Sequence, residues 1–497
     1  MPLWWSVFLA AAAAMALFAV VLLLAARPLA GALLHAGVDI TLQRLFQTRY
    51  STSLFGMLNV LRKMGVESFG ETMLRAASGQ PLSRPMGTPL HLSPWSRLLF
   101  QPVFVTPRLP TPQEIHIDTT VTVGPRANRP LRLDIPVLLA GMSYGGALTV
   151  AAKVALARAA NAAGTATNSG ESYLQEERDA AQRLILQHHR GLWPNGTMQR
   201  PEILRNADAI EVQFGQGAQA AASIVTPAGL VGARMRAVYG LERGERSEIA
   251  TRFSGVSGPD GVVALLRDLK TRFPVPVGVK VGATDYLEAD LDVFLEGGID
   301  FLTLDGAEGG THGGPTALQD DVGLPTLHAL VRAERHLRAR ERRSGVTLIA
   351  AGQLRTPGEC LKALALGADA VYVGTGAMVA LIADQAARAL PGAPPSQLFL
   401  QSAPGRLRRR LDVPRATRNV ANYLQSLTAE MALVAQALGR SALREVGPED
   451  LVALDRDVAE LCGVRLAWRS ADGPPLAQQV PMGHAGGEAP AQAELVH

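Results

Sequence analysis

The feature that most constrains the fold is a repeated alternation, after Ile115, of short apolar segments with longer segments rich in alanine and leucine. The apolar segments are predicted strands, at Val137–Ala140, Gly164–Asn168, Ala209–Phe214, Val277–Val281, Phe301–Asp305, Thr347–Ala351 and Ala370–Gly374. Helical patterns separate them, at Thr149–Ala163, Gly261–Phe273, Leu287–Gly297, Leu324–Arg340 and Pro357–Gly367. Strands that alternate with helices usually run in one direction, so the pattern predicts an α/β fold with a parallel sheet.

Two parallel architectures fit this pattern, a closed (β/α)8 barrel and a doubly wound open sheet. Seven predicted strands approach the eight of a barrel, although the sequence does not show where the eighth lies. An open sheet that binds dinucleotides usually carries GxGxxG after its first strand, and the sequence GMSYGG at residues 141–146 lacks that spacing. We therefore predict a (β/α)8 TIM barrel over residues 116–400.

An apolar segment without charge, from Leu3 to Ala26, precedes the predicted barrel. Its 24 residues would form about 36 Å of helix, enough to cross a hydrocarbon core of roughly 30 Å. No basic residue precedes it, as a secretory signal peptide would require, whereas Arg27, Arg44 and Arg49 follow it. We therefore predict an uncleaved transmembrane helix within residues 1–30, which anchors the protein by a single pass and leaves the catalytic domain cytoplasmic.

The composition of the remaining segments predicts their organisation. Residues 31–115 are predicted to contain an amphipathic juxtamembrane helix, with a second weak span as the alternative, and then a proline-rich connecting arm. Residues 401–470 are predicted to form a helical extension. Residues 471–497 consist mostly of Pro, Gly, Ala and Gln, so we expect them to be disordered.

Cysteine content and charge exclude several classes of protein. The two cysteines, Cys360 and Cys462, cannot form a disulfide scaffold or an iron–sulfur cluster held by three or four thiolates. A net charge of +4 over 497 residues does not suggest a nucleic-acid partner. Because no HExxH motif or His/Cys spacing is present, we expect no metal site.

The carboxyl ends of the strands form the reactive rim of a barrel, so the residues after each predicted strand matter most. Glycines at six of the seven predicted ends would let the backbone approach a ligand and expose N–H groups to anionic oxygens. The last two strands end in Gly352-Gln353 and Gly374-Thr375, which favours the phosphate site that barrels place after strands seven and eight. We predict a phosphorylated cofactor; glycines that only end strands are the alternative.

Three side chains at this rim are candidates for chemistry. Lys280 stands alone in an apolar strand, so its burial requires negative charge, either a reduced flavin or an ion pair with Asp305 or Glu308. Glu171 can donate a proton or bind an ammonium or imine nitrogen, or it can be an acid in a first helical turn. His312 can shuttle a proton or contact the substrate, or it can be an exposed loop residue.

Taken together, these strand ends resemble the FMN-binding barrel of the glutamate synthase large subunit. The resemblance covers about residues 129–383 and is carried, in the same order, by AGMSYGGALTVAAKVALARAANAAGTATNSGE, IEVQFGQGA, VGVKVG and LTLDGAEGGTHGGP. The N-terminal span and the segment VPRATRNVANYLQSLTAEMALVAQALG also resemble a smaller, membrane-anchored, stand-alone branch of the family. That branch lacks the glutaminase domain, and we expect none here.

The resemblance implies an oxidoreductase that acts on CH–NH2 donors with FMN as cofactor. Reduced FMN would pass a hydride from N5 to C2 of a 2-imino acid such as 2-iminoglutarate, giving an L-amino acid as in glutamate biosynthesis. Glu171, Lys280 and His312 are the implied catalytic residues. The implied cofactor-binding residues are Met142, Ser143, Tyr144, Asn168, Gln213, Gln216, Lys280, Gly309, Gly310, Gly352, Gln353, Gly374 and Thr375.

Three departures from the family leave parts of this function open. The segment Ala380–Pro404 has no cysteine where the family binds a 3Fe–4S cluster, so the electron donor is unknown. Gln219 stands where the family has a substrate-binding lysine, and His312 stands where it has a glycine. The substrate, the nitrogen source and a homo-oligomeric state therefore stay open.

Other functions are compatible with the same sequence. FMN-dependent oxidation of a small amine or an N-methylated amino acid is the main alternative, and Gln219 favours it. A non-redox barrel that binds a phosphorylated metabolite, or a degenerate barrel that only holds partners at the membrane, would be colourless rather than yellow.

Overall fold

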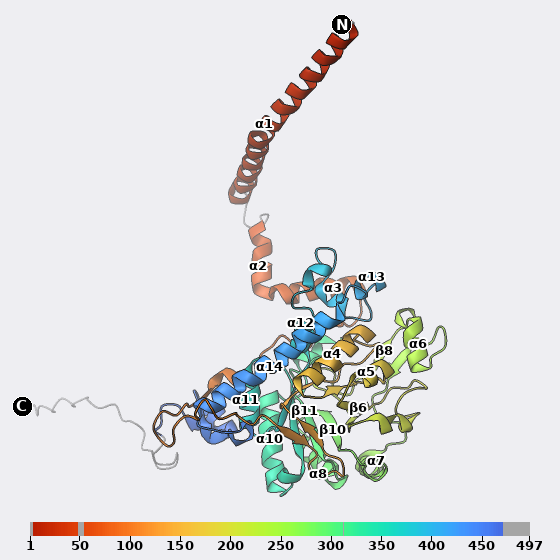
Figure 1. The fold of residues 1–497 in the computed structure, drawn as a ribbon, viewed down its shortest axis with the longest axis vertical. Coiled ribbons are helices and arrows are strands. Elements are labelled where there is room, and N and C mark those ends of the chain that lie inside the picture. The colour runs from red at the N-terminus through yellow and green to blue at the C-terminus, as the bar shows by residue number, and fades with distance from the viewer. Residues whose placement is uncertain (1–2, 48–53, 312, 471–497) are drawn as a thin grey trace, which may run out of the picture. The chain divides into compact units, whose positions relative to one another are not determined.

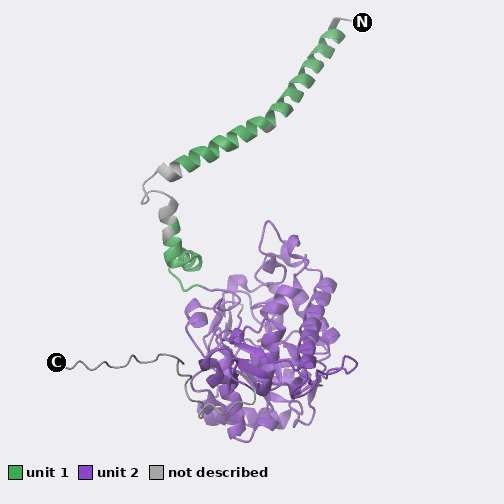
Figure 2. Cartoon of the chain, turned by 90° about the vertical axis from the view of Figure 1, so that its left-hand side faces the viewer, with its two compact units in different colours: residues 1–82 green, residues 83–497 purple. Residues whose placement is uncertain are grey.

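The computed structural model describes residues 3–47, 54–311 and 313–470. The chain forms two compact units, residues 1–82 and residues 83–497 (Figure 2). Every strand of the described residues belongs to the second unit. The predicted disordered tail, residues 471–497, lies outside the described residues.

The second unit is built on eight parallel strands that form a nearly closed barrel (Figure 1). In order around the barrel, the strands are β4 (Val137–Leu139), β5 (Thr167–Asn168), β6 (Leu184–His188), β7 (Ala209–Gln213), β10 (Val277–Gly282), β11 (Phe301–Asp305), β12 (Thr347–Ala351) and β13 (Ala370–Val373). β13 pairs with β4, and the N–H of Leu139 donates to the carbonyl of Ala166 over 3.1 Å, which bridges the remaining gap between β4 and β5. The predicted α/β fold with a parallel barrel sheet is confirmed.

The eighth strand, β6, is the element that the sequence analysis did not find. It follows β5 after one short helix, α5 (Gln175–Ala180), and the polar residues Gln187 and His188 interrupt its apolar pattern. Because β6 adds one strand to the count, Lys280 lies on the fifth strand of the barrel rather than on the fourth. β12 and β13 become the seventh and eighth strands, after which barrels commonly bind phosphate.

Helices cover the barrel close to their predicted positions. They are α4 (Val150–Ala163), α7 (Gly258–Arg272), α8 (Leu287–Glu296), α10 (Thr326–Ala339) and α11 (Pro357–Ala365). The predicted C-terminal helix is α14 (Val413–Ala437), which packs along α4 (Figure 1). The remaining elements of this unit are β1 (Leu98–Phe100), β2 (Val121–Val123), β3 (Leu131–Leu133), β8 (Ile224–Thr226), α6 (Ala233–Tyr239), β9 (Ser247–Ile249), α9 (Thr316–Asp320), α12 (Thr375–Leu381), α13 (Gly405–Arg408), β14 (Leu451–Ala453), α15 (Arg456–Cys462) and β15 (Arg465–Leu466).

The interior of the barrel changes from apolar to polar along the strands. Near the amino ends, Ile185, Phe301 and Ile349 pack with the hairpin of β2 and β3 in one buried cluster. Alternate residues of a strand face the same side, so Gln187 and Thr303 follow Ile185 and Phe301 into the interior. The polar part of the barrel interior therefore lies toward the carboxyl ends of the strands.

The first unit contains α1 (Leu3–Gln47), α2 (Leu54–Met64) and α3 (Val66–Ser78). Within α1, the stretch Trp4–Gln43 is long and apolar enough to cross a membrane, and its most apolar window is not buried in the protein. From the sequence we expected an amphipathic juxtamembrane helix, or a second weak span, after residue 30. α1 continues through Pro28 to Gln47, and α2 and α3, which follow it, separate apolar from polar residues.

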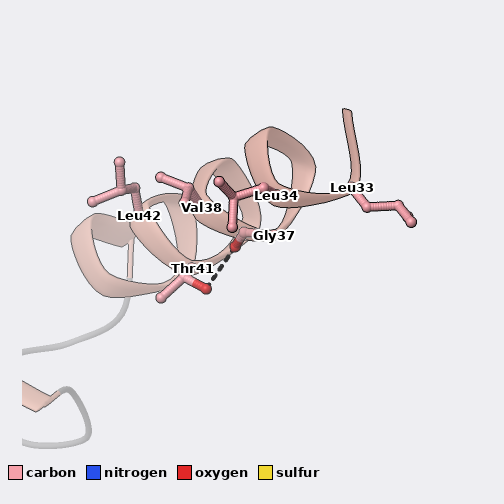
Figure 3. A pocket seen from close by; sticks show the side chains of 6 residues that line it. All are labelled: Leu33, Leu34, Gly37, Val38, Thr41 and Leu42. Atoms are coloured by element: carbon pink, nitrogen blue, oxygen red, sulfur yellow. Dashed lines mark hydrogen bonds between the residues drawn. The ribbon is translucent and has the colours of Figure 1, made fainter. Parts of the chain in front are cut away.

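Figure 3 shows the second half of α1, where apolar side chains point in several directions around the axis. They include Leu33, Leu34, Val38 and Leu42. The hydroxyl of Thr41 donates to the Gly37 carbonyl over 2.7 Å, so this polar group is satisfied within the helix itself. This half of α1 therefore continues the row of exposed apolar side chains, although it also carries Asp39 and Arg44, which the predicted span lacks.

A buried ion pair joins the first two strand–helix units of the barrel. Lys153 on α4 and Glu177 on α5 are each 1% exposed, and Nζ lies 2.8 Å from Oε1. The same Nζ donates to the carbonyl oxygens of Met142 at 2.8 Å, Asn168 at 3.0 Å and Ser169 at 3.1 Å. Burial lowers the pKa of Lys153 and raises the pKa of Glu177, and their mutual attraction opposes both shifts. The pair therefore ties the loops after β4 and β5 to α4 and α5.

Two adjacent histidines are buried at the end of β6. The ring of His188 stacks on Phe253 with 5.1 Å between centroids, and His189 Nδ1 accepts from the Gly191 N–H over 3.1 Å. Burial lowers the pKa of His188 to about 4 and the pKa of His189 to about 3. Both side chains are therefore neutral at physiological pH.

Replacement of Lys153 by methionine should strongly destabilise the barrel. Lys153→Met leaves the Glu177 carboxylate buried without a cation, which should lower the free energy of unfolding by about 3–5 kcal/mol. The double variant Lys153→Met/Glu177→Leu removes both charges and should recover most of this loss. Denaturant unfolding followed by circular dichroism measures both. A double variant as unstable as the single one would contradict the assigned ion pair.

The buried histidines predict a loss of stability in mild acid. The unfolded chain protonates histidine near pH 6.5, whereas the folded protein does so only near pH 3–4, so the unfolded state binds more protons in between. The free energy of unfolding should fall as pH decreases from about 6.5 to about 4, by on the order of 3 kcal/mol per histidine.

A non-titrating variant tests this pH dependence. His189→Asn keeps an acceptor for the Gly191 N–H and should flatten the decline of stability between pH 6.5 and 4. The control His116→Asn, at an exposed histidine, should leave the decline unchanged. Equal slopes for His189→Asn and the wild-type protein would show that His189 is not the titrating group.

Candidate active site at the carboxyl rim of the barrel

The glycine-rich strand ends lie at one rim of the barrel. All eight strands are parallel, so their carboxyl ends point the same way. Close contacts between these ends confirm the arrangement. A Cβ atom on Gly217, after β7, would collide with the carbonyl oxygen of Gly306, after β11, and one on Gly374, after β13, would lie 3.6 Å from Cβ of Ala140, after β4.

The rim leaves open space beside Thr375. A Cβ atom on Gly310 would meet only Thr375 Oγ1 at 3.5 Å and the Met86 carbonyl oxygen at 3.7 Å. Gly374 is similarly open, with Ala140 as its only close neighbour. These glycines therefore border a space in which a ligand can approach backbone N–H groups closely.

Two other predicted glycines are required by packing. A Cβ atom on Gly309 would collide with Oδ1 of Asp305. Gly352 adopts a φ of +125°, and a Cβ atom there would collide with the Thr326 hydroxyl. Both positions therefore exclude any other residue whether or not a ligand is bound.

The connecting arm covers part of the rim. The N–H of Met86 donates to the Thr311 carbonyl over 2.8 Å, and the N–H of Arg84 donates to the Gly314 carbonyl over 3.0 Å. The arm therefore runs beside the glycine-rich loop after β11.

Gln353 contributes its side chain to the arm rather than to the open space. Its Nε2 donates to the Thr88 carbonyl over 2.5 Å, and its Oε1 lies 3.3 Å from His91 Nδ1. The side chain of Gln353 is therefore used by the arm, and only the backbone of this residue is left to contact a ligand.

Lys280 points into the barrel at this rim. It lies opposite Gln213 on β7 and Thr303 on β11, and its Nζ is 3.2 Å from Oδ2 of Asp305. Burial opposes the charge, but Asp305, Glu211 and Glu171 together hold the pKa of Lys280 above its ordinary value. The side chain is therefore protonated. Of the two alternative ion-pair partners considered from the sequence, the structure selects Asp305.

Glu308 has a different role. Its Oε2 accepts from the N–H of Thr326 over 2.8 Å and from the Thr326 hydroxyl over 2.7 Å. These bonds satisfy donors at the start of α10, where a negative charge is also favoured by the helix dipole.

Glu211 is a central residue that the sequence analysis missed. Its Oε1 accepts from Asn168 Nδ2 at 2.9 Å and Gln187 Nε2 at 2.8 Å, and its Oε2 accepts from the Thr303 hydroxyl at 2.7 Å and the Tyr372 hydroxyl at 3.3 Å. These partners come from four other strands. The available signal was the polar pair at positions 211 and 213 of one apolar segment, since residues two apart in a strand share a face.

Glu171 is linked to a second missed residue, Arg190. Gln213 Nε2 donates to Glu171 Oε1 over 2.9 Å, and Arg190 Nη2 donates to Gln213 Oε1 over 3.3 Å. The amide of Gln213 therefore lies between a carboxylate and a guanidinium. Arg190 follows β6, the strand that was not predicted from the sequence, so the residues after that strand end were not considered.

The other predicted cofactor contacts divide into backbone and side-chain groups. Tyr144 is fully buried, its ring packs against Tyr239, and its N–H donates to the Ser172 hydroxyl over 2.8 Å. The Asn168 side chain is used inside the barrel by Glu211 and Tyr372. Met142, Ser143 and Gln216 lie in loops at the rim. The side chains of Tyr144 and Asn168 are therefore already used within the protein, and the loops that contain Met142, Ser143 and Gln216 can offer backbone groups to a ligand.

Positions 219 and 312 mark the departures from the resembled family. Gln219 is buried, and its Nε2 donates to the Thr311 hydroxyl. It therefore brings no positive charge to the glycine-rich loop. His312, predicted as a catalytic residue, lies outside the described residues.

Neither a metal centre nor a thiol site is apparent in the described ranges. No group of three or more His, Cys, Asp or Glu side chains there could hold a metal ion. Cys360 and Cys462 are buried free thiols, and burial raises the pKa of each to about 12. Neither thiol has the lowered pKa of a reactive cysteine.

Comparisons with known proteins point to one family. Residues 108–441 match the conserved region in glutamate synthase. The glutamate synthase large subunit-like protein of Rhizobium meliloti is 36% identical over 374 residues, covering 71% of this chain and 83% of that protein. The archaeal glutamate synthase (NADPH) of Methanocaldococcus jannaschii is 31% identical over 344 residues, covering 68% of this chain and 66% of that protein.

Among solved structures, a flavocytochrome b2 variant with pyruvate bound is 14% identical with a TM-score of 0.47. The match covers 83% of this chain and 88% of that chain. The family match spans most of the second unit and includes every rim residue described above. This chain belongs to the glutamate synthase family.

Proposed function

We propose that this protein is an FMN-dependent oxidoreductase of glutamate synthase type that reduces a 2-imino acid, such as 2-iminoglutarate, to an L-amino acid. The observation that carries the proposal is Lys280, a protonated side chain buried at the glycine-rich rim. A fixed cation at such a place stabilises negative charge that develops on a bound group.

The residues of the rim fit FMN. The space beside Gly310, Gly374 and Thr375 suits the phosphate, which backbone N–H groups would hold together with those near Gly352. Lys280 and Gln213 would lie against the ring system, together with the backbone of residues 142–144 and 216. Bound FMN would supply the hydride that reduces the carbon–nitrogen double bond.

The side chains of the protein would position the substrate and its proton. Glu171 would bind the substrate nitrogen, and the hydrogen bond that its Oε1 accepts from Gln213 Nε2 fixes the carboxylate. Asp305 keeps Lys280 charged and in place. His312 remains a candidate for proton transfer from the glycine-rich loop.

A second candidate function is the oxidation of a small amine or an N-methylated amino acid. It is favoured by Gln219, which is uncharged and held by Thr311 where the resembled family has a lysine. Anaerobic reduction of the flavin by sarcosine or a simple amine, but not by L-glutamate, would favour this candidate over the first.

We also propose that α1 anchors the protein in a membrane. The most apolar window of the stretch Trp4–Gln43 is not buried in the protein, and exposed apolar surface of this size requires a lipid or protein covering. Arg62 and Lys63, in the last turn of α2, place positive charge after the span, which favours a cytoplasmic barrel.

Loss of the rim cation should weaken flavin chemistry. Lys280→Met should reduce bound FMN, or slow its anaerobic reduction, by about tenfold or more, because a fixed charge beside the flavin is lost. The matched control is Lys270→Met, since Lys270 is also paired with an aspartate, Asp300, at 2.6 Å, but at the amino end of the barrel. The visible spectrum and stopped-flow reduction give the readout. Wild-type flavin content and reduction rate in Lys280→Met would contradict the proposal.

Charge in the apolar helix should abolish membrane association. Val20→Arg/Leu22→Arg adds two arginines to α1, each costing about 2.5–3.5 kcal/mol at the centre of a span. The wild-type protein should stay with membranes after carbonate extraction, whereas this variant should be released. The control Met73→Arg, on exposed α3, should behave as the wild type. Release of the wild-type protein would show that α1 does not span the bilayer.

A further inference from the structure

The barrel unit buries three lysine or arginine side chains, and only one of them lacks a carboxylate partner. Lys153 pairs with Glu177, and Lys280 pairs with Asp305. The third is Arg190, which is 2% exposed at the end of β6. Among the residues that the structure describes, none places a carboxylate within ion-pair distance of its guanidinium.

The contacts of Arg190 are all with neutral groups. Its Nη1 donates to the Thr251 carbonyl at 2.6 Å and weakly to the Ala221 carbonyl at 3.4 Å, and its Nη2 donates to Gln213 Oε1 at 3.3 Å. Its Nε has no partner in the described structure. Because a buried cation is costly unless an anion compensates it, the charge of Arg190 is left for an anion from outside the chain to compensate.

Glu171 is in the opposite situation. It is buried, it accepts from Gln213 Nε2 at 2.9 Å, and no lysine or arginine of the described ranges lies within ion-pair distance of it. Burial lowers the pKa of Arg190, and Glu171 is the charged group that opposes this shift. The two charges are therefore close enough to interact, yet Gln213 keeps them apart.

These three side chains occupy consecutive strand ends. Glu171 follows β5, Arg190 follows β6 and Gln213 ends β7, and these strands are neighbours in the barrel. Lys280 lies opposite Gln213 on the next strand, β10. The rim thus presents a separated cation and anion next to the proposed flavin site.

We propose that Arg190 and Glu171 recognise the two charged ends of an α-amino or α-imino acid. The α-carboxylate binds Arg190, the nitrogen binds Glu171, and Gln213 sets the separation between them. This inference rests on the proposed function and adds to it the residue that selects the α-carboxylate of the substrate. Arg190 supplies a positive charge for the substrate carboxylate, which the uncharged Gln219 cannot do. When a substrate without an α-carboxylate binds, the buried charge of Arg190 has no anion beside it.

Binding of matched ligand pairs tests the inference. Isothermal titration calorimetry of the full-length protein in detergent compares L-glutamate with 4-aminobutyrate, L-glutamine with 4-aminobutanamide, and L-norvaline with butylamine. Each pair differs only in the α-carboxylate. In at least one pair the amino acid should bind at least about tenfold more tightly, the contribution of a charge-assisted hydrogen-bonded pair. Equal binding within every pair, or no binding by any amino acid, would overturn the inference.

Variants assign the preference to Arg190. Arg190→Gln should reduce the difference within the pair to less than about twofold, whereas Arg190→Lys keeps a cation and should retain the preference with weaker binding. The control Arg246→Gln, on an exposed arginine, should match the wild type. If Arg190 only holds the Thr251 and Ala221 carbonyls, Arg190→Gln will bind the pairs as the wild type does, and the inference is wrong.

Two further measurements keep the outcomes separate. Thermal unfolding shows whether Arg190→Gln folds, and if it does not, the wild-type pairs and Arg190→Lys decide the question. Flavin content is measured independently of calorimetry. A protein that discriminates the α-carboxylate but retains no FMN would contradict the proposed function, whereas a flavoprotein that does not discriminate would contradict only this inference.

Discussion

The burial of the Glu211 carboxylate is the constraint on which the interior of the barrel depends. A charge inside a closed sheet is tolerated only when hydrogen bonds replace water, and Glu211 receives four of them from four other strands. Each of those donors is thereby held in one orientation. The network separates the apolar base of the barrel from the rim, and its negative charge also helps to keep Lys280 protonated.

The rim above this network is organised by a small number of buried charges. Lys153 and Glu177 hold the loops after β4 and β5 from outside the barrel, whereas Lys280 and Asp305 face its interior. Both pairs compensate their own burial. Arg190 and Glu171 do not pair with each other, because the Gln213 amide lies between them. Lys153 and Glu177 therefore maintain the fold, Lys280 keeps its charge at the proposed flavin site, and the charges of Arg190 and Glu171 are left for a ligand to compensate.

The connecting arm gives the rim part of its covering. Its backbone bonds to the glycine-rich loop after β11, and Gln353 binds it from the loop after β12. The arm begins directly after the unit that contains α1, so the chain passes from the proposed membrane anchor to the covering of the site with no intervening domain.

Local sequence determined the architecture, the common rim of the glycines and the inward position of Lys280. Alternating strands and helices favour a parallel sheet, and the strands of such a sheet all end on the same side. Side chains alternate between the two faces of a strand, so the position of Lys280 in VGVKVG fixes the face on which it lies. The same period failed for β6, where Gln187 and His188 break the apolar run. Gln187 is buried because its amide bonds to Glu211 on β7, whereas His188 is buried as a neutral ring stacked on Phe253.

Only the tertiary structure decided which polar groups are satisfied. Glu211 meets Tyr372, which lies 161 residues away in the chain, and Gln353 bonds to Thr88, which lies 265 residues away. Nothing in a local pattern encodes such distances. For the same reason, the sequence could not show that Lys280 has a carboxylate partner and that Arg190 has none, since a charge is compensated by whatever the closed barrel brings beside it.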